Sequence, residues 1–151
     1  MVDQLTRLYS FRGFMRASAD LLAIPNGRPS CAMLLSIDLR HVKFIEHALG
    51  RESGDQLLTR TAEILRRVFR GAAVIGRLGF DKFAVLILAS PSKCTELMAS
   101  LNQSIDAANL AEPTAYLSLG GKYCLFDPRH SDFIAPWLKR KNRPKQNRIY
   151  H

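Results

Sequence analysis

Residues 72–88 read Ala-Ala-Val-Ile-Gly-Arg-Leu-Gly-Phe-Asp-Lys-Phe-Ala-Val-Leu-Ile-Leu, and this stretch decides the fold class. Two apolar runs, 72–78 and 84–88, flank the pentapeptide Gly79-Phe80-Asp81-Lys82-Phe83. Short apolar runs on either side of turn residues are typical of buried strands joined as a hairpin. The sequence therefore predicts a β-hairpin with the pentapeptide at its tip.

Helix and strand patterns alternate on both sides of this hairpin. Helices are predicted from the cap Ser10 to about Leu22, over 41–49, over 54–70, after the cap Ser90-Pro91, and over 131–140. Further strands are predicted over 31–38, 114–119, 122–125 and 148–150, with a loop over 24–29. The run 31–38 is nearly all apolar, which favours a central strand buried on both faces. The expected fold class is an α/β (α+β) sandwich, with a mixed central sheet of about five strands flanked by helices.

Length and composition fit one globular domain over residues 1–151. Residues 1–9 read as a lead-in, and 125–151 as a divergent, basic C-terminal segment. No apolar run approaches the roughly 18 residues that would span a bilayer. Cys31, Cys94 and Cys124 lack metal-ligand spacing and read as reduced thiols. We therefore expect a cytoplasmic domain, although a longer parent protein could carry a membrane anchor.

Positive charge is concentrated near the C-terminus. Residues 129–151 hold seven Lys or Arg and one Asp, out of a net charge of +9 for the chain. Such a cluster can bind nucleic acid, anionic lipid or an acidic protein, or it can be a solvated helix. Pro144 interrupts the run 139–148, and no aromatic residues interleave it. A nucleic-acid or membrane-surface function is therefore disfavoured.

Five separated segments, in order, resemble the motifs of one bacterial family, the GGDEF domains of diguanylate cyclases. They are Asp3–Leu8, Asp38–Glu46, Gly50–Asp55, Arg77–Phe83 and Leu117–Gly120. The pentapeptide at 79–83 corresponds to the Gly-Gly-Asp-Glu-Phe signature. The resemblance covers about residues 3–124; the closing Ala-Lys-x-x-Gly-Arg-Asn motif survives at best as Asn147-Arg148. It implies a nucleotidyl-cyclase-like fold with a shortened, divergent C-terminal end.

The resemblance also implies a metal site, which is damaged in this chain. Family members hold Mg²⁺ on carboxylates while two domains, each with GTP, meet face to face. Asp38 and Asp81 match two of those carboxylates, but Arg40 and Lys82 stand where acidic residues are usual. Two carboxylates and two cations sum to zero, so metal affinity should fall steeply. No cofactor is expected, and Mg²⁺ only if nucleotide binding survives.

Nucleotide recognition and product inhibition look impaired on the same comparison. Asp55 matches the guanine-binding Asp, but Glu46 replaces its Asn partner and cannot donate a hydrogen bond. Phe80 replaces a glycine and would be strained if the turn needs a left-handed residue. The inhibitory Arg-x-x-Asp motif keeps Arg70, whereas its Asp is Ala73.

The surviving acidic residues also have purely structural interpretations. Asp38 could cap the following helix, Asp55 could favour the first turn of its helix, and Asp81 is a common turn residue. Because both interpretations fit the sequence, the residues alone do not choose between them.

The sequence favours a catalytically inactive GGDEF domain that acts as a regulatory module in cyclic di-GMP signalling. Its partner would be another signalling protein or domain, such as a phosphodiesterase, a sensor or a cyclic di-GMP effector, and a homodimer is compatible with the resemblance. The alternative is a nucleotide sensor without turnover, in which Lys82 and Arg40 hold the phosphates of weakly bound GTP. An active diguanylate cyclase ranks below both.

Overall fold

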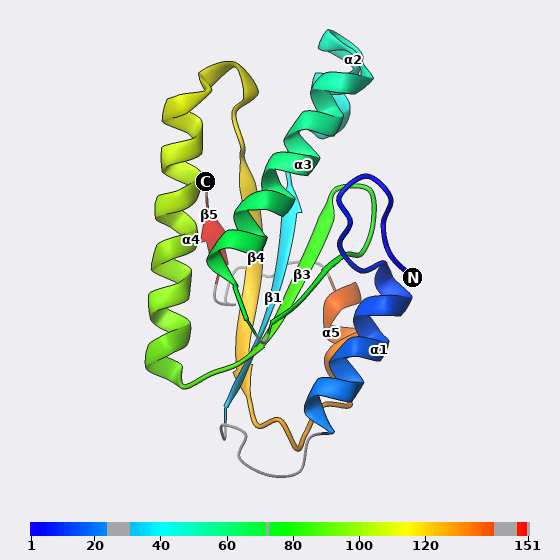
Figure 1. The fold of residues 1–151 in the computed structure, drawn as a ribbon, viewed down its shortest axis with the longest axis vertical. Helices are drawn as coiled ribbons and strands as arrows, with labels where there is room; N and C mark the ends of the chain where they lie inside the picture. The colour runs from blue at the N-terminus through cyan, green and yellow to red at the C-terminus, as the bar shows by residue number, and fades with distance from the viewer. Residues whose placement is uncertain (24–30, 72, 141–147, 151) are drawn as a thin grey trace.

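The computed structural model of the chain describes residues 1–23, 31–71, 73–140 and 148–150. Its central sheet has the order β2-β3-β1-β4-β5 (Figure 1). The strands are β1 (Ala32–Leu39), β2 (Val74–Arg77), β3 (Lys82–Leu88), β4 (Leu119–Phe126) and the short β5 (Arg148–Tyr150). All pairs between these named strands are antiparallel, so the expected mixed sheet is wrong in this respect. The predicted hairpin is present as β2 and β3.

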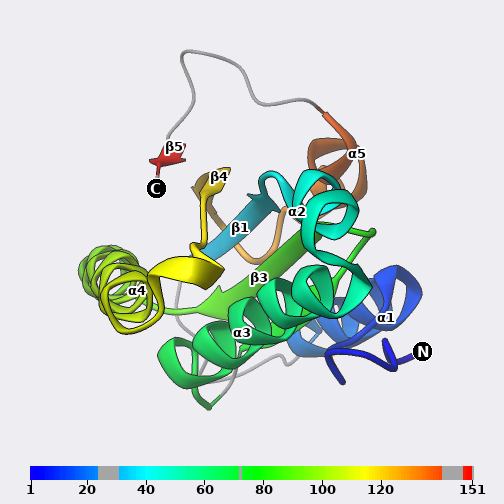
Figure 2. The same ribbon diagram turned by 90° about the horizontal axis from the view of Figure 1, so that it is seen from above.

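Helices cover both faces of the sheet, which confirms the predicted α/β sandwich. α3 (Arg51–Val68) and α4 (Pro91–Ala111) lie on one face, whereas α1 (Phe11–Leu22) and α5 (Ile134–Lys139) lie on the other (Figures 1 and 2). α2 (Val42–Leu49) extends beyond the end of β1 and packs on α3.

Strand β1 forms the centre of the core, as its apolar run predicted. Met33, Leu35 and Ile37 face the layer of α3 and α4, whereas Ala32 and Leu34 face the layer of α1 and α5. All five side chains are fully buried. Successive side chains of a strand point to opposite faces of the sheet, so β1 supplies apolar side chains to both helix layers.

Two predicted helix caps are confirmed. The Ser10 hydroxyl accepts a hydrogen bond from the Gly13 amide at 3.3 Å, and the Ser90 hydroxyl accepts one from the Lys93 amide at 3.2 Å. The lead-in before Ser10 also joins the sheet. Tyr9 makes an isolated parallel bridge with Gly76, which anchors residues 1–9 against the edge strand β2.

Helix α3 begins earlier than its sequence pattern predicted. It starts at Arg51, directly after Gly50, whose φ of 100° ends α2 and lets the chain turn into the next helix. Glu52 therefore lies in the first turn. The interpretation of Asp55 as a first-turn residue is wrong.

Strand β4 also differs from the prediction. The segment before it is not a strand, because Pro113–Ala115 forms the 3-10 turn η1. β4 then runs without interruption through Gly120 and Gly121, where a break was expected. The missing side chains allow close contacts here: a Cβ at Gly121 would lie 2.2 Å from the Ser36 carbonyl oxygen of β1. Gly121 lets β1 and β4 approach closely, and Gly120 leaves room for the Arg40 side chain, so neither glycine ends the strand.

The C-terminal prediction holds in part. α5 starts at Ile134 instead of residue 131, and the predicted last strand is β5. The predicted loop 24–29, and Lys141, Arg143, Lys145 and Asn147 of the basic segment, lie outside the described residues. Within the described ranges, no helix has the length and apolarity needed to cross a bilayer.

Candidate functional site

The hairpin tip and the end of β1 form the candidate site. Asp38 of β1 lies directly opposite Lys82 of β3 in the strand register. The Lys82 Nζ lies 3.9 Å from Asp38 Oδ1, and both side chains are over one-third exposed. A lysine ammonium thus pairs with a carboxylate that the resemblance assigned to a metal ion.

Asp81 lies at the same end of the sheet. Its carbonyl oxygen accepts a hydrogen bond from the Leu39 amide at 2.8 Å, which ties the hairpin to the end of β1. Its place in the bend before β3 agrees with the interpretation of Asp81 as a turn residue. Among the described residues, no group of three or more His, Cys, Asp or Glu side chains could hold a metal. The structure therefore brings Asp38 and Asp81 to one site with few acidic ligands.

Asp38 does not cap the following helix. The N-cap of α2 is His41, whose φ is 66° and which makes no side-chain cap hydrogen bond. The interpretation of Asp38 as an N-cap residue is therefore wrong, and the left-handed turn at His41 directs the chain from β1 into α2.

Arg40 is held over strand β4. Its amide donates to the Ser118 carbonyl at 2.8 Å, and a Cβ at Gly120 would meet its guanidinium. The side chain therefore lies against the bare backbone of Gly120. The absence of a side chain at this glycine creates the space that a cation fills next to Asp38 and Lys82.

Phe80 is the aromatic residue at the hairpin tip, and 39% of its surface is exposed. Lys43 Nζ lies 5.7 Å and Arg77 Cζ 5.8 Å from the centre of its ring, within range of cation–π attraction. Its φ is not positive, so the expected left-handed strain is absent. The turn accepts phenylalanine, and the ring stands between two cations.

Arg77 fixes the shape of the tip. Its Nε donates to the Phe80 carbonyl at 3.0 Å, and its Nη1 lies 3.1 Å from Asp3 Oδ1. Asp3 also accepts hydrogen bonds from the amide and hydroxyl of Thr6, at 2.8 and 2.7 Å. Burial raises the pKa of Asp3, but the Thr6 hydrogen bonds and the Arg77 charge outweigh it and hold that pKa below its ordinary value. The N-terminal lead-in therefore supports the hairpin.

The expected guanine-binding remnant lies on α2 and α3. A Cβ at Gly54 would lie 3.4 Å from the Glu46 carboxylate, which therefore rests on the residue next to Asp55. Glu46 and Asp55 are both half-buried. The structure places the two predicted residues on neighbouring helices, with carboxylates at both positions.

Arg70, the remnant of the expected inhibitory site, is exposed after the end of α3. Ala73, where the family motif has its Asp, is half-buried and carries no ligand group. The arginine is therefore present without the carboxylate of the family motif.

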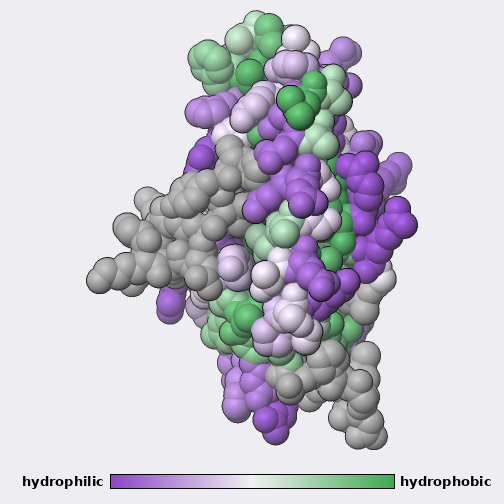
Figure 3. All heavy atoms as spheres, turned by 90° about the vertical axis from the view of Figure 1, so that its left-hand side faces the viewer, coloured by the Kyte–Doolittle hydropathy of each residue, from purple (hydrophilic) through white to green (hydrophobic). Residues whose placement is uncertain are grey.

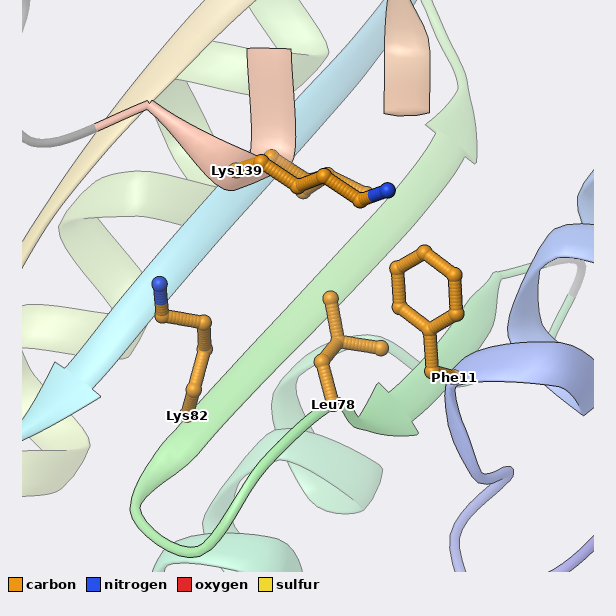
Figure 4. Close-up of a pocket in the computed structure, with 5 residues that line it drawn as sticks. Phe11, Leu78, Lys82 and Lys139 are labelled. Carbon is orange, nitrogen blue, oxygen red and sulfur yellow. The ribbon is translucent and has the colours of Figure 1, made fainter. Parts of the chain in front are cut away.

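A pocket of about 400 Å³ opens beside the hairpin. Its lining comprises Phe11, Leu78, Lys82, Leu138 and Lys139 (Figure 4). The Lys139 ammonium lies 5.7 Å from the centre of the Phe11 ring, and the Lys82 side chain extends toward β1. The sequence placed Lys139 only in a basic segment, because nothing in the sequence shows that α5 folds back onto the hairpin strand.

Lys122 is a second lysine whose position the sequence did not predict. It is 1% exposed, and its Nζ donates to the carbonyls of Trp137 at 2.7 Å and Arg140 at 3.0 Å. The ammonium also lies 4.3 Å from the centre of the Trp137 ring. Burial lowers the pKa of Lys122, and the charges of Lys82 and Arg140 lower it further. Lys122 thus holds the C-terminal end of α5 on the sheet.

Exposed apolar residues lie on α2. Phe44 is 70% and Leu49 is 63% exposed. In the view of Figure 3, hydrophobic residues gather at the upper end of the molecule, where α2 lies. Because α2 also carries Lys43, the Phe80 tip continues into a surface that is both apolar and basic.

The protein-family model described as "Diguanylate cyclase, GGDEF domain" matches residues 1–140 of this chain. The probable diguanylate cyclase DgcC of Escherichia coli K12 is 30% identical over 110 residues, which cover 72% of this chain and 29% of DgcC. The cyclic di-GMP phosphodiesterase NbdA of Pseudomonas aeruginosa is 36% identical over 84 residues, or 56% of this chain and 11% of NbdA. The chain therefore spans less than a third of these relatives.

Solved structures show the same fold. A microbial GGDEF domain studied for its interaction with cyclic di-GMP superposes with a TM-score of 0.69 at 25% identity, covering 85% of this chain and 81% of that one. The Pseudomonas aeruginosa diguanylate cyclase SiaD, solved with its activator SiaC, gives 0.61 at 20% identity, covering 69% and 40%. The family match, the relatives and the fold agree, and this chain belongs to the GGDEF domain family of cyclic di-GMP signalling.

Proposed function

We propose that this GGDEF domain does not synthesise cyclic di-GMP and acts instead as a regulatory module that binds another signalling protein. The observation that carries the proposal is the ion pair between Lys82 and Asp38. Mg²⁺ in phosphoryl-transfer sites needs hard, anionic oxygen ligands beside the phosphates. Here the carboxylate of Asp38 pairs with the ammonium group of Lys82 and not with a metal ion.

The charge around the ion pair supports the same conclusion. Arg40, which lies two residues after Asp38 in the chain, packs against Gly120, and Lys82 is the first residue of β3. A divalent cation bound by Asp38 and Asp81 would have to approach the positive charges of Lys82 and Arg40. Repulsion between these like charges opposes binding of the metal ion, even where the site is partly hydrated.

The guanine side of the site supports it independently. Glu46 rests on Gly54, next to Asp55, where the family resemblance expects an amide donor. An ionised carboxylate only accepts hydrogen bonds, so it cannot satisfy an acceptor of the base. Leaving a buried acceptor unpaired costs about 1–3 kcal/mol, which weakens discrimination for guanine.

The surface around Phe80 supports a protein partner. The exposed ring is flanked by Lys43 and Arg77, and Phe44 is exposed on the adjacent helix. Aromatic and arginine side chains contribute much of the binding energy of protein interfaces. SiaD, which shares the fold, was solved in complex with an activator protein, and NbdA is a phosphodiesterase, so a separate signalling protein or a linked phosphodiesterase domain is the partner we propose.

Enzyme assay tests the loss of catalysis. The purified chain is incubated with GTP and either Mg²⁺ or Mn²⁺, and cyclic di-GMP is quantified by mass spectrometry. We expect no product. Product that disappears in Asp81→Ala would show an active cyclase and refute the proposal.

A binding measurement tests the interface. Phe80→Ala should weaken binding of a candidate phosphodiesterase at least about tenfold, as expected for a residue that anchors an interface, whereas Lys93→Ala on α4 should leave the affinity unchanged.

A second candidate function, nucleotide sensing without turnover, is favoured by the pocket that Lys82 and Lys139 line. Two ammonium groups could hold phosphates directly, by charge-assisted hydrogen bonds and without a metal. Calorimetric titration with GTP and GDP in the absence of Mg²⁺ tests it. No heat of binding at millimolar nucleotide would reject the sensor, whereas binding that is lost in Lys82→Ala and Lys139→Ala would support it.

A further inference from the structure

Two of the three cysteines meet at the end of the sheet opposite the hairpin tip. Cys31 directly precedes β1, and Cys94 lies in the first turn of α4. The Cys31 carbonyl accepts a hydrogen bond from the Ala89 amide at 3.1 Å, and Cys94 Sγ lies 3.9 Å from the Ala89 carbonyl oxygen. Both cysteines therefore flank one residue. Cys31 continues the alternation of Met33, Leu35 and Ile37 along the strand, so its side chain faces the helix layer that holds Cys94.

We propose that Cys31 and Cys94 form a redox-active dithiol that closes to an intramolecular disulfide on oxidation by a peroxide. The pair joins residues far apart in the sequence, so the bond would link the start of β1 to the N-terminal end of α4. Cys124 is the internal reference, because it lies on β4 and packs against the apolar cluster on the other face of the sheet.

The two thiols differ in access, which sets the order of the steps. Cys31 is half-buried, whereas Cys94 is 2% exposed. Burial raises the pKa of Cys94, and contact with Cys31 raises it further. A thiolate is the reactive form, so the more accessible Cys31 is the thiol that meets the oxidant first.

The chemistry balances with hydrogen peroxide as the oxidant. The Cys31 thiolate attacks one peroxide oxygen, which breaks the O–O bond and yields a sulfenic acid and, after protonation, one water. The Cys94 thiolate then attacks the sulfenic sulfur, forming the S–S bond and releasing the second water. In total the two thiols give up two protons and two electrons, and one peroxide becomes two waters. A dithiol reductant reverses the reaction by thiol–disulfide exchange.

The disulfide would enclose residues 32–93 in a covalent loop, which contains β1, α2, α3 and the hairpin of the candidate site. A loop of this length restricts the unfolded chain strongly. We therefore expect the midpoint of thermal unfolding to rise by several degrees on oxidation, without a change in the hairpin itself.

Peptide mapping tests the proposal. Arg40 and Lys122 separate the three cysteines, so trypsin places each in its own peptide. The reduced chain is treated with hydrogen peroxide, alkylated and digested without reductant. We expect a peptide pair joined through Cys31 and Cys94, free Cys124, and a raised melting temperature that dithiothreitol reverses.

Three variants separate the outcomes. Cys124→Ser should retain both the crosslink and the shift in melting temperature. Cys31→Ser should lose both, and since Cys31 is not fully buried this variant should fold; Cys94→Ala fills the same role at the buried position. Absence of the linked peptides in the folded wild-type chain, a crosslink through Cys124, or an equal thermal shift in Cys31→Ser would overturn the proposal.

Discussion

The ammonium nitrogen of Lys82 lies 3.9 Å from a carboxylate oxygen of Asp38, across the antiparallel pair of β3 and β1. The two residues are direct partners in the register of β1 and β3, so the pairing of these two strands brings the two side chains together. Both side chains stay partly solvated, and such exposed pairs contribute little to stability. The consequence of this ion pair is local, because the Lys82 charge neutralises a carboxylate that a metal ion would need as a ligand.

Reversing the charge at Lys82 should recover metal affinity. Lys82→Glu removes the cation and adds a third carboxylate beside Asp38 and Asp81, so Mg²⁺ or Mn²⁺ should bind at least about tenfold more tightly than to the wild type. Calorimetric titration with MnCl₂ measures the change. Lys93→Glu makes the same change of charge on α4, away from the site, and should have no effect. Equal gains in both variants would show a nonspecific effect of charge.

Asp3→Asn should destabilise the domain in a way that depends on pH. The carboxylate accepts two hydrogen bonds from Thr6 and pairs with Arg77, so its loss should cost about 1–2 kcal/mol in the free energy of unfolding at pH 7. The pKa of Asp3 is lowered in the folded chain, so its stabilisation is complete above the unfolded pKa and is lost as the pH falls through the folded one.

Urea unfolding of wild type and Asp3→Asn at several pH values measures this difference. The gap between the two proteins should be largest near neutral pH and shrink below about pH 4, the range in which an aspartate titrates. A gap that stays constant down to pH 3 would contradict the assignment of the pKa shift to Asp3.

Lys122→Met should loosen α5. The variant keeps most of the side-chain volume but removes the donors to the Trp137 and Arg140 carbonyls, at a cost of about 1–3 kcal/mol. Trp137 is the single tryptophan of the chain, so its fluorescence reports on this helix directly. Emission should shift to longer wavelength as the ring gains solvent. An unchanged spectrum and stability would show that the lysine does not hold α5.

The same lysine predicts an alkaline effect of known sign. The pKa of Lys122 is lowered in the folded chain, so between its folded and unfolded values the unfolded chain binds more protons. Stability of the wild type relative to Lys122→Met should therefore rise with pH toward about 10.4, the ordinary lysine value. Urea unfolding between pH 8 and pH 10 tests it, and a falling difference would contradict it.

Alanine substitutions at the two adjacent glycines of β4 should destabilise the domain to very different extents. A Cβ at Gly121 would lie 2.2 Å from the Ser36 backbone oxygen, which cannot move without parting β1 from β4. A Cβ at Gly120 would meet the end of the Arg40 side chain, which can swing away. Gly121→Ala should cost about 1–3 kcal/mol or more, as overpacking does, and Gly120→Ala much less. Thermal unfolding of the two variants measures the contrast, and equal losses would refute it.

The sequence predicted the sheet core and the hairpin well because both depend on local patterns. The apolar run of β1 and the caps Ser10 and Ser90 leave few alternatives for the chain. The start of α3 and the path of β4 were mispredicted, because glycine signals a break as well as a close approach. Gly121 allows the close approach of β1, whereas Gly120 leaves room for the Arg40 side chain, and both contacts appear only in the folded structure.

For the candidate site, the sequence identified the altered residues but not their contacts. It placed Asp38, Asp81, Lys82 and Arg40 in one site, and the structure brings them to one end of the sheet. It did not predict the positions of Lys122 and Lys139. Both depend on α5, which packs on the same face of the sheet as α1, and no local pattern in the sequence indicates that contact. A lysine after two glycines reads as a surface residue, and its burial depends entirely on that tertiary contact.

In the function proposed here, Lys82 and Arg40 take the place of the metal at this site, and titration with GTP in the presence and absence of Mg²⁺ tests this replacement. The measurement does not depend on dimer formation, which cyclic di-GMP synthesis would require. We expect that Mg²⁺ does not strengthen GTP binding to the wild-type chain. Tight GTP binding that requires Mg²⁺ and is abolished in Asp81→Ala would contradict it.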